Sequence, residues 1–366
     1  MPDSNEAYDI LYNLLDKAQR SRKIRRTIAI LLIFGLLGGL VYFITGLLPK
    51  HYRLSISGGD ILAKRHYLVK VLQQEGLRNG LELDVQPIAS HSEALLAVSS
   101  GQLDLALIPS VSTSRLQDVD HVAALPAETV HLLVQPDITD LASLKGRVVN
   151  TGALGEYKRD LATGLLGYAG LFPDIDYVET QYTDEELMGI RTDRLPDALF
   201  SISYMPSYLT DYFVQVHGYQ LIALPFADSI SYRNYWASVT EIPAGIYRVD
   251  PAVPADTLTT LGVDIEIIAH AGTDPQAIAA FLETLYQSSA ETVIHQPLVE
   301  EDGNSASVFP LSAGTVQYLK RDQSIFTMEF VDSIKNVAGS FMALLSTLIV
   351  IIRWFKGKKK EDDENG

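Results

Sequence analysis

The sequence predicts an α/β protein of two lobes, flanked by one transmembrane helix at each end. Strand-like and helix-like segments alternate between residues 50 and 335 of the 366-residue chain, which is typical of parallel sheets covered by helices. This stretch is long enough for two lobes rather than one. Uncharged runs at residues 27–49 and 336–352 lie on either side of it and predict the two membrane spans.

The two uncharged runs differ in length. Residues 27–49 form a run of 23, and about 20 apolar residues are enough to cross a bilayer. No small-x-small pair follows it, so we interpret it as a retained anchor rather than a cleaved signal peptide. The second run has 17 residues, and Trp354 follows where aromatic belts lie. We expect a span at 336–355, with a buried C-terminal helix as the alternative.

Basic residues flank both runs on the side away from the central segment, at residues 17–26 and 353–360. Positive flanks mark the cytoplasmic side of a membrane. Tails 1–26 and 356–366 are therefore expected in the cytoplasm. Residues 50–335 are expected to form an extracytoplasmic domain attached to the cell membrane.

Composition excludes several classes of function. The formal net charge of −16 argues against a nucleic-acid partner. The chain has no cysteine, so it has neither a disulfide framework nor a thiolate metal site. It contains no nucleophile elbow, Ser-x-x-Lys, His-Glu-x-x-His or Walker loop, and its eight histidines lack ligand-like spacing. We expect no enzyme activity, no catalytic residue, no metal and no cofactor.

The central segment predicts the following elements in order. Strands are expected at 52–58, 81–89, 103–110, 128–136, 146–152, 176–182, 197–203 and 262–270. Helices are expected at 63–77, 92–101, 160–171 and 274–293, the last with Asp274 as its cap and Pro275 in its first turn.

Five segments carry a resemblance to a known family. They are "SHSEALLAVSSGQLDLALIPS", "DLASLKGRVVNTGALGEYKRDLATGLLGYAGL", "DALFSISYMPS", "IPAGIY" and "FPLSAGTVQYL". In this order and spacing they resemble the TAXI family, the solute receptors of one class of tripartite (TRAP) transporters. The similarity covers roughly residues 52 to 320. It implies a type II periplasmic-binding-protein fold, with lobe one at about 51–134 and 262–325 and lobe two at about 135–261. Crossing strands would join the lobes, and the ligand would lie between them.

The chain departs from the family pattern at two loops. The family usually carries Gly-Ser-x-Gly-Gly-Thr-Tyr-Tyr after the first strand, whereas this chain has "GGDILAKRHY", in which only Tyr67 keeps its place. The family's Gly-Ser-Gly-Thr in the second loop is Gly155-Glu156-Tyr157-Lys158 here. The fold that the resemblance implies survives these changes, but the implied ligand site is altered.

The loop from Gly152 to Gly155 precedes a predicted helix, and such turns expose backbone N–H groups that bind anions. Three interpretations of Glu156 remain open. Its carboxylate could itself lie at the positive end of the helix. It could face away while a ligand carboxylate takes the N–H groups with help from Lys158 or Arg159. It could instead contact the amine of a cationic ligand.

Loops after predicted strands supply further candidate ligand-binding residues, because ligands of open α/β sheets lie beyond the carboxyl ends of the strands. These candidates are Ser57, Gly58, Gly59, Asp60, Tyr67, Ser90, His91, Ser92, Ser110, Tyr157, Ser203 and Tyr204. Local capping or turn formation is the alternative for each serine. The aromatic cluster of Tyr232, Tyr235 and Trp236 could line a pocket or pack in the core.

The resemblance implies a receptor that binds a small carboxylate or amino acid and presents it to TRAP membrane subunits. The alternative is a degenerate receptor fold that acts as an envelope scaffold or ligand-responsive partner without transport. The two altered loops and the double anchor favour the alternative, and the overall match favours the receptor.

Overall fold

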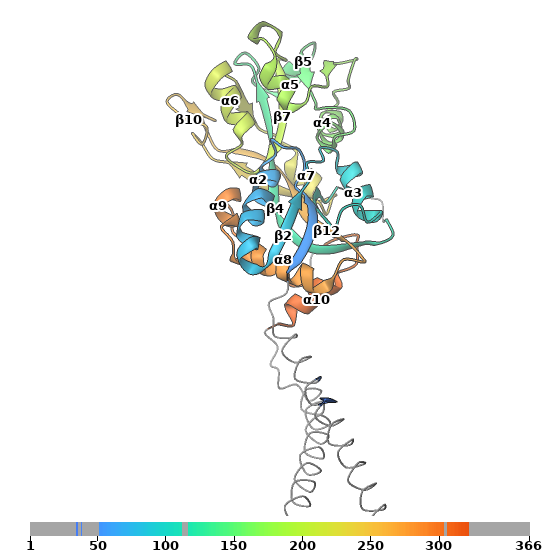
Figure 1. Ribbon diagram of the computed structural model, residues 1–366. Helices are drawn as coiled ribbons and strands as arrows, with labels where there is room; N and C mark the ends of the chain where they lie inside the picture. The colour runs from blue at the N-terminus through green and yellow to red at the C-terminus, as the bar shows by residue number, and fades with distance from the viewer. Residues whose placement is uncertain (1–33, 36–37, 39–50, 112–115, 304–305, 322–366) are drawn as a thin grey trace, which may run out of the picture.

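The computed structural model describes residues 34–35, 38, 51–111, 116–303 and 306–321 (Figure 1). The predicted spans at 27–49 and 336–355 lie outside these ranges, except for Phe34, Gly35 and Gly38, and so do both predicted tails. None of the helices within the described ranges is long and apolar enough to cross a bilayer. The two anchors therefore stay predictions.

A ten-stranded sheet runs through the described chain in the order β2-β1-β3-β12-β4-β7-β5-β6, with β8 beside β4 and β9 beside β12. A separate hairpin joins β10 and β11. The strands are β1 (Tyr52–Ser57), β2 (Leu81–Val85), β3 (Leu105–Pro109), β4 (Val119–Val134), β5 (Val148–Asn150), β6 (Val178–Thr180), β7 (Ala198–Ser203), β8 (Gln220–Ile222), β9 (Ala237–Ile242), β10 (Arg248–Val249), β11 (Ala252–Val253) and β12 (Leu258–His270).

Helices cover this sheet in two groups, which gives the two α/β lobes that the sequence predicts (Figure 1). The helices are α2 (Lys64–Gly76), α3 (His91–Ser99), α4 (Tyr157–Tyr168), α5 (Asp184–Gly189), α6 (Tyr208–His217), α7 (Ala227–Ser231), α8 (Pro275–Gln287), α9 (Ala290–Ile294) and α10 (Ala313–Leu319). Short 3-10 turns lie at Leu77–Asn79, Leu141–Leu144 and Thr192–Arg194.

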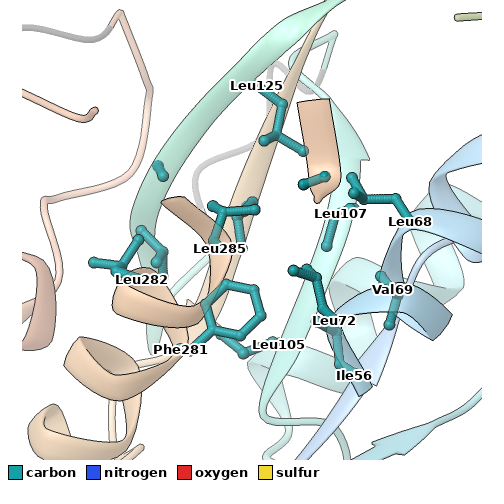
Figure 2. Packing of buried hydrophobic residues seen from close by; sticks show 14 of the residues in the cluster. Ile56, Leu68, Val69, Leu72, Leu105, Leu107, Leu125, Phe281, Leu282 and Leu285 are labelled. Carbon is teal, nitrogen blue, oxygen red and sulfur yellow. The ribbon is translucent and has the colours of Figure 1, made fainter. Parts of the chain in front are cut away.

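Lobe one is built on the parallel strands β1, β2 and β3. Helix α2 buries Leu68 and Leu72 against them, and α8 buries Phe281 and Leu285 in the same core (Figure 2). The helical spacing of these apolar residues, four apart in each pair, puts them on one face of each helix. Helix α3 packs a second cluster on the other side of β3 and β12.

Lobe two is built on β5, β6 and β7, which are parallel to one another. Helix α4 packs Leu161, Leu165 and Leu166 against β5, β7, the C-terminal part of β4 and the N-terminal part of β12. Helix α6 packs Phe213 and Val214 on a further cluster that includes β8. Each lobe therefore has its own buried core.

The long strands β4 and β12 belong to both lobes. The first half of β4 pairs with β12 beside β3, whereas its second half, from Thr129, pairs with β7 and β8. The register between β4 and β12 shifts between Val263 and Ile265, next to the pairing of Val263 with Glu128. This bulge lies where the two strands pass from one lobe to the other, and bulges bend the strand that carries them.

Two expected elements need correction. The strand expected at 128–136 begins earlier, at Val119. Pro126 normally argues against a continuous strand, but it falls in the bulged part of β4 and is tolerated there. The helix expected at 274–293 is divided into α8 and α9 by an extended Ser288. Ser289 there donates from its backbone N–H and its hydroxyl to Glu75 of α2, which replaces helix hydrogen bonds with a tertiary contact.

Helix α10 docks on α8 through Gly314. A Cβ atom at this position would lie 2.4 Å from Cβ of Ile278 and 2.7 Å from the carbonyl oxygen of Pro275. We expect Gly314→Ala to lower the free energy of unfolding by roughly 1–3 kcal/mol, the usual cost of overpacking. Gly189→Ala is the matched control, because nothing lies within 4 Å of the Cβ that it would add. Urea unfolding of both variants measures the difference, and equal stabilities would contradict this view of the docking.

Candidate functional site

Arg65, Glu128 and Tyr157 meet where the lobes join, and we call them the Arg65 cluster. Arg65 lies at the start of α2, Glu128 on the crossing strand β4, and Tyr157 at the first position of α4. Arg65 Nε is 3.0 Å from Glu128 Oε1, and the Tyr157 hydroxyl donates to Glu128 Oε2 at 3.0 Å. The guanidinium also lies over the Tyr157 ring, 5.6 Å from its centroid. One carboxylate thus joins both lobes.

The Arg65 cluster is almost fully buried, with 6% of Arg65 and 1% of Glu128 exposed. Burial raises the pKa of Glu128, and the charge of Arg65 opposes this rise. Burial and the nearby Glu128 carboxylate raise the pKa of the Tyr157 hydroxyl well above its ordinary value, so the hydroxyl stays a donor. A buried charge of this kind is tolerated because each partner offsets the desolvation of the other.

The loop between β5 and α4 is filled by the protein's own charges. Lys158 Nζ lies 2.5 Å from Asp184 Oδ1 and 3.6 Å from Glu156 Oε2, and Lys158 is 6% exposed. Glu156 is the N-cap residue of α4, but its side chain accepts no hydrogen bond from the helix. Gly152 has φ +109°, and a Cβ there would lie 2.6 Å from Lys158 Cε. Glycine is required at this turn, which Lys158 crosses.

Loops of the two lobes touch directly. Ser90 caps α3 by accepting from the N–H of Glu93, and its hydroxyl donates to the carbonyl of Gly155 at 3.3 Å. Lys64 donates to the carbonyl of Met205 at 3.3 Å. The lobes are therefore in a closed arrangement, with cavities of only about 50 and 60 Å³ beside these contacts. Typical ligand pockets are roughly 300–1,000 Å³, so neither space is large enough.

A cavity of about 480 Å³ lies beside Tyr157, and we call it the α4 cavity. It is lined by His91, Val111, Tyr157, Asp160, Leu161, Gly164, Leu165, Tyr168, Ile230, Arg233, Asn234 and Trp236. His91 comes from α3 of lobe one, and the residues of α4 come from lobe two. Both lobes therefore contribute to a cavity of ligand size.

A second cavity of about 330 Å³ lies on the crossing strands and is lined by Ser110, His121, Asp264 and Glu266, among others. His121 Nδ1 lies 3.1 Å from Glu266 and its Nε2 lies 3.3 Å from Glu301. Burial alone would lower the pKa of His121, but these two carboxylates raise it to about 9. Burial raises the pKa of Asp264 to about 6. The His121 group fastens the segment after α9 to β4, which is a structural task.

The structure brings most of the sequence-predicted site residues to the junction of the lobes. Asp60, Glu156, Tyr157 and Lys158 line one small cavity together, Asp60 and Ser203 line the other, and Ser90, His91 and Gly155 lie beside them. Gly58 and Gly59 form the turn that leads to Asp60.

Other predicted residues lie apart or serve local structure. Tyr67 is 61% exposed on α2, and Ser110 lines the cavity of His121. Ser57 accepts from the N–H of Gly59, and the exposed Ser92 is paired with the ring of His91. Tyr204 is fully buried in the core of lobe one, and its hydroxyl has no hydrogen-bond partner among the described residues.

Sequence reasoning missed Arg65, Glu128 and Asp184 as members of the junction. Two signals were available. Arg65 lies in the altered loop-and-helix segment "GGDILAKRHY", and Glu128 is a lone acid before the apolar run "TVHLLV". A charge next to a buried strand requires a partner. The sequence could not say which residue that partner is.

Comparison with known proteins gives low similarities. No family model and no curated protein matches the chain. The SsuA aliphatic sulphonate-binding protein of Escherichia coli matches at 15% identity and a TM-score of 0.40, over 81% of this chain and 87% of that one. An ancestral arginine-binding protein matches at 12% and 0.41, over 68% and 97%. A protein of Bordetella bronchiseptica matches at 16% and 0.43, over 73% and 79%. These values assign no family.

Proposed function

We propose that the protein is a membrane-anchored extracytoplasmic solute receptor of the kind that the resemblance to the TAXI family implies. It would bind a small organic acid or amino acid between its lobes and present it to TRAP membrane subunits. The observation that carries the proposal is the α4 cavity, because it has the volume of a ligand pocket and residues of both lobes line it. Binding there would favour the closed arrangement of the lobes.

The crossing strands supply a place for the lobes to move. The bulge beside Glu128 interrupts the β4–β12 ladder at the point where both strands change lobes. A bulge leaves a residue unpaired and disrupts the ladder locally, so fewer hydrogen bonds hold the two strands together there. Hinges of this kind absorb the change in backbone angles when two lobes close.

One observation favours the second candidate, a degenerate receptor fold without transport. Arg65 and Lys158 are the most deeply buried cations of the junction. Arg65 is already paired with Glu128, and Lys158 is already paired with Asp184. A carboxylate ligand would find neither cation free. In this reading the closed lobes form a scaffold for another envelope protein.

Thermal unfolding of the full-length protein in detergent separates the two candidates. Dicarboxylates, amino acids and apolar monocarboxylates are added one class at a time. A ligand at a hundred times its Kd stabilises the folded state by about 2.7 kcal/mol, which raises the Tm of a domain this size by roughly 5–10 °C. A rise with one class supports the receptor. If no class raises the Tm, the scaffold is the better account.

Genes for TRAP-type membrane subunits beside the gene for this protein would support a role in transport.

Glu156→Ser tests whether the loop at Gly152–Gly155 holds the anion. The Glu156 side chain accepts no hydrogen bond from the helix N–H groups, and Asp184 is the nearer partner of Lys158. We therefore expect Glu156→Ser to change the affinity of the protein for carboxylates by less than about twofold. Calorimetry of the variant against Glu241→Ser, an exposed control on β9, measures this. A fivefold or larger gain in carboxylate affinity would place the anion at this loop.

The anchors are part of the proposal and rest on the two uncharged runs with their basic flanks. Protease added outside intact spheroplasts should digest residues 50–335 and spare tags at both termini. Cleavage of a C-terminal tag from outside would rule out the two-span topology.

A further inference from the structure

We propose that the α4 cavity binds a small apolar anion, an aromatic or branched carboxylate, whose charge pairs with Arg233. This inference rests on the proposed receptor function and narrows its ligand from organic acids and amino acids in general to one chemical class. Three features of the cavity carry it, namely its open space, its apolar wall and the position of its charges.

The open space lies over a glycine in the middle of α4. Gly164 lines the cavity, and nothing lies within 4 Å of the Cβ that it lacks. A glycine in a helix interior costs about 1 kcal/mol relative to alanine. Its backbone angles are ordinary, so the turn does not require it. The helix thus accepts a less stable residue at the point where a larger side chain would enter the cavity.

The wall of the cavity is one face of α4. Tyr157, Leu161, Gly164, Leu165 and Tyr168 recur at helical spacing, so they lie along a single stripe. Ile230 of α7 and Trp236, which immediately precedes β9, also line the cavity. Most of this surface is apolar or aromatic, which suits a hydrocarbon or ring rather than a dicarboxylate.

The charges stand at different ends of that stripe. Arg233 lies over the ring of Tyr168 at the C-terminal end of α4, 5.9 Å from the ring centroid. Asp160 lies near the N-terminal end, eight residues or about 12 Å earlier along the helix. Burial lowers the pKa of His91, and the negative charge of Asp160 opposes this lowering. An anion is therefore repelled from the Asp160 end and attracted to the Arg233 end.

Arg233 is available for such a ligand. It is exposed, and among the residues that the structure describes no carboxylate forms an ion pair with it. The neighbouring Asn234 side chain donates to the carbonyl of Ile230, so it does not compete for the guanidinium. Arg65 and Arg159, by contrast, are each paired with a glutamate.

The cavity also adjoins the Arg65 cluster, because Tyr157 belongs to both. A ligand against the Tyr157 ring would contact the residue that donates to Glu128 on the crossing strand. Occupancy of the cavity would in this way stabilise the contact that holds the lobes together.

Calorimetry of the full-length protein in detergent tests the inference with three probes of one size: 3-phenylpropionate, 3-phenylpropan-1-ol and 3-phenylpropylamine. Titrations into detergent alone are subtracted. We expect the acid to bind most tightly and the amine least. Arg233→Gln should weaken the acid by roughly fivefold and leave the alcohol unchanged. Arg78→Gln, which removes an exposed arginine of lobe one, is the control for net charge.

Gly164→Leu should abolish binding of both acid and alcohol, because leucine fills the cavity while favouring the helix. Gly167→Leu is the matched control on the same helix, since Gly167 lies outside the cavity lining and its Cβ would make only an ordinary contact with Phe172, at 3.9 Å. If Gly164→Leu does not fold, the difference between acid and alcohol in Arg233→Gln still decides.

Three results would overturn the inference. They are equal affinities for acid and amine, loss of acid binding in Gly167→Leu but not Gly164→Leu, and an unchanged acid affinity in Arg233→Gln. If succinate or glutamate binds and Gly164→Leu leaves that affinity intact, this inference fails while the receptor function stands. If no probe, dicarboxylate or amino acid binds, the receptor function fails as well.

Discussion

Replacing Glu128 by glutamine should lower the free energy of unfolding by about 3–5 kcal/mol, because it leaves the buried charge of Arg65 without its partner. The change keeps the shape of the side chain, so a cavity does not explain the loss. It also removes the acceptor charge that Tyr157 bonds to across the lobes. Urea unfolding of the full-length protein, followed by circular dichroism, measures the effect.

A double-mutant cycle separates the ion pair from the packing around it. Arg65→Met combined with Glu128→Gln leaves no charge in the Arg65 cluster, so the double variant should be more stable than Glu128→Gln alone. The control pair is Arg53 and Glu82, whose atoms are 3.8 Å apart and whose side chains are 71% and 61% exposed. Glu82→Gln should cost less than about 1 kcal/mol. If Glu128→Gln lowers the free energy of unfolding no more than Glu82→Gln does, the Arg65 cluster does not stabilise the junction of the lobes.

Raising the pH from about 6.5 to 9 should destabilise the protein by roughly 3 kcal/mol through His121. Its pKa is raised to about 9 in the folded state by Glu266 and Glu301, against about 6.5 when unfolded. The folded state therefore holds the proton more tightly. This contribution is complete below the unfolded pKa and is lost as the pH rises through the folded pKa.

His121→Gln should flatten the stability profile over this interval, as measured by unfolding at a series of pH values. Asp264, with a pKa of about 6, completes most of its titration below the interval and so contributes little to the slope. His295→Asn, at an exposed position with φ +56° that asparagine tolerates, is the control and should keep the wild-type slope. A wild-type slope in His121→Gln would exclude this histidine as the source.

The sequence predicts most of the local structure because the periodicities of strand and helix are short-range signals. The alternation of apolar residues in β1 and the helical spacing in α2 and α8 correctly indicated these elements. The two corrected elements lie where a distant partner decides. Ser289 leaves the helix for Glu75, and Pro126 is tolerated in β4 because the strand bulges between lobes.

The site shows the same division. The ends of strands and the loops after them place Asp60, Ser90, Glu156 and Ser203 at the junction of the lobes, and their role in ligand binding stays a prediction. The sequence indicated three residues that line the α4 cavity, His91, Tyr157 and Trp236, but it did not predict that they would share one cavity. Its lining comes from four separate stretches of chain, at His91, Val111, 157–168 and 230–236. No periodicity within one stretch indicates what will face it across a cavity.

The sequence by itself determined that this chain alternates strands and helices, carries two uncharged runs with basic flanks and buries apolar faces on both sides of parallel strands. Each of these properties depends on residues within a few positions of one another. Only the tertiary structure decided that Glu128 is the partner of Arg65 and that Arg233 is left without one among the described residues. The physical reason is that desolvation makes a buried charge need a partner, whereas the crossing of β4 and β12 determines which partner is within reach.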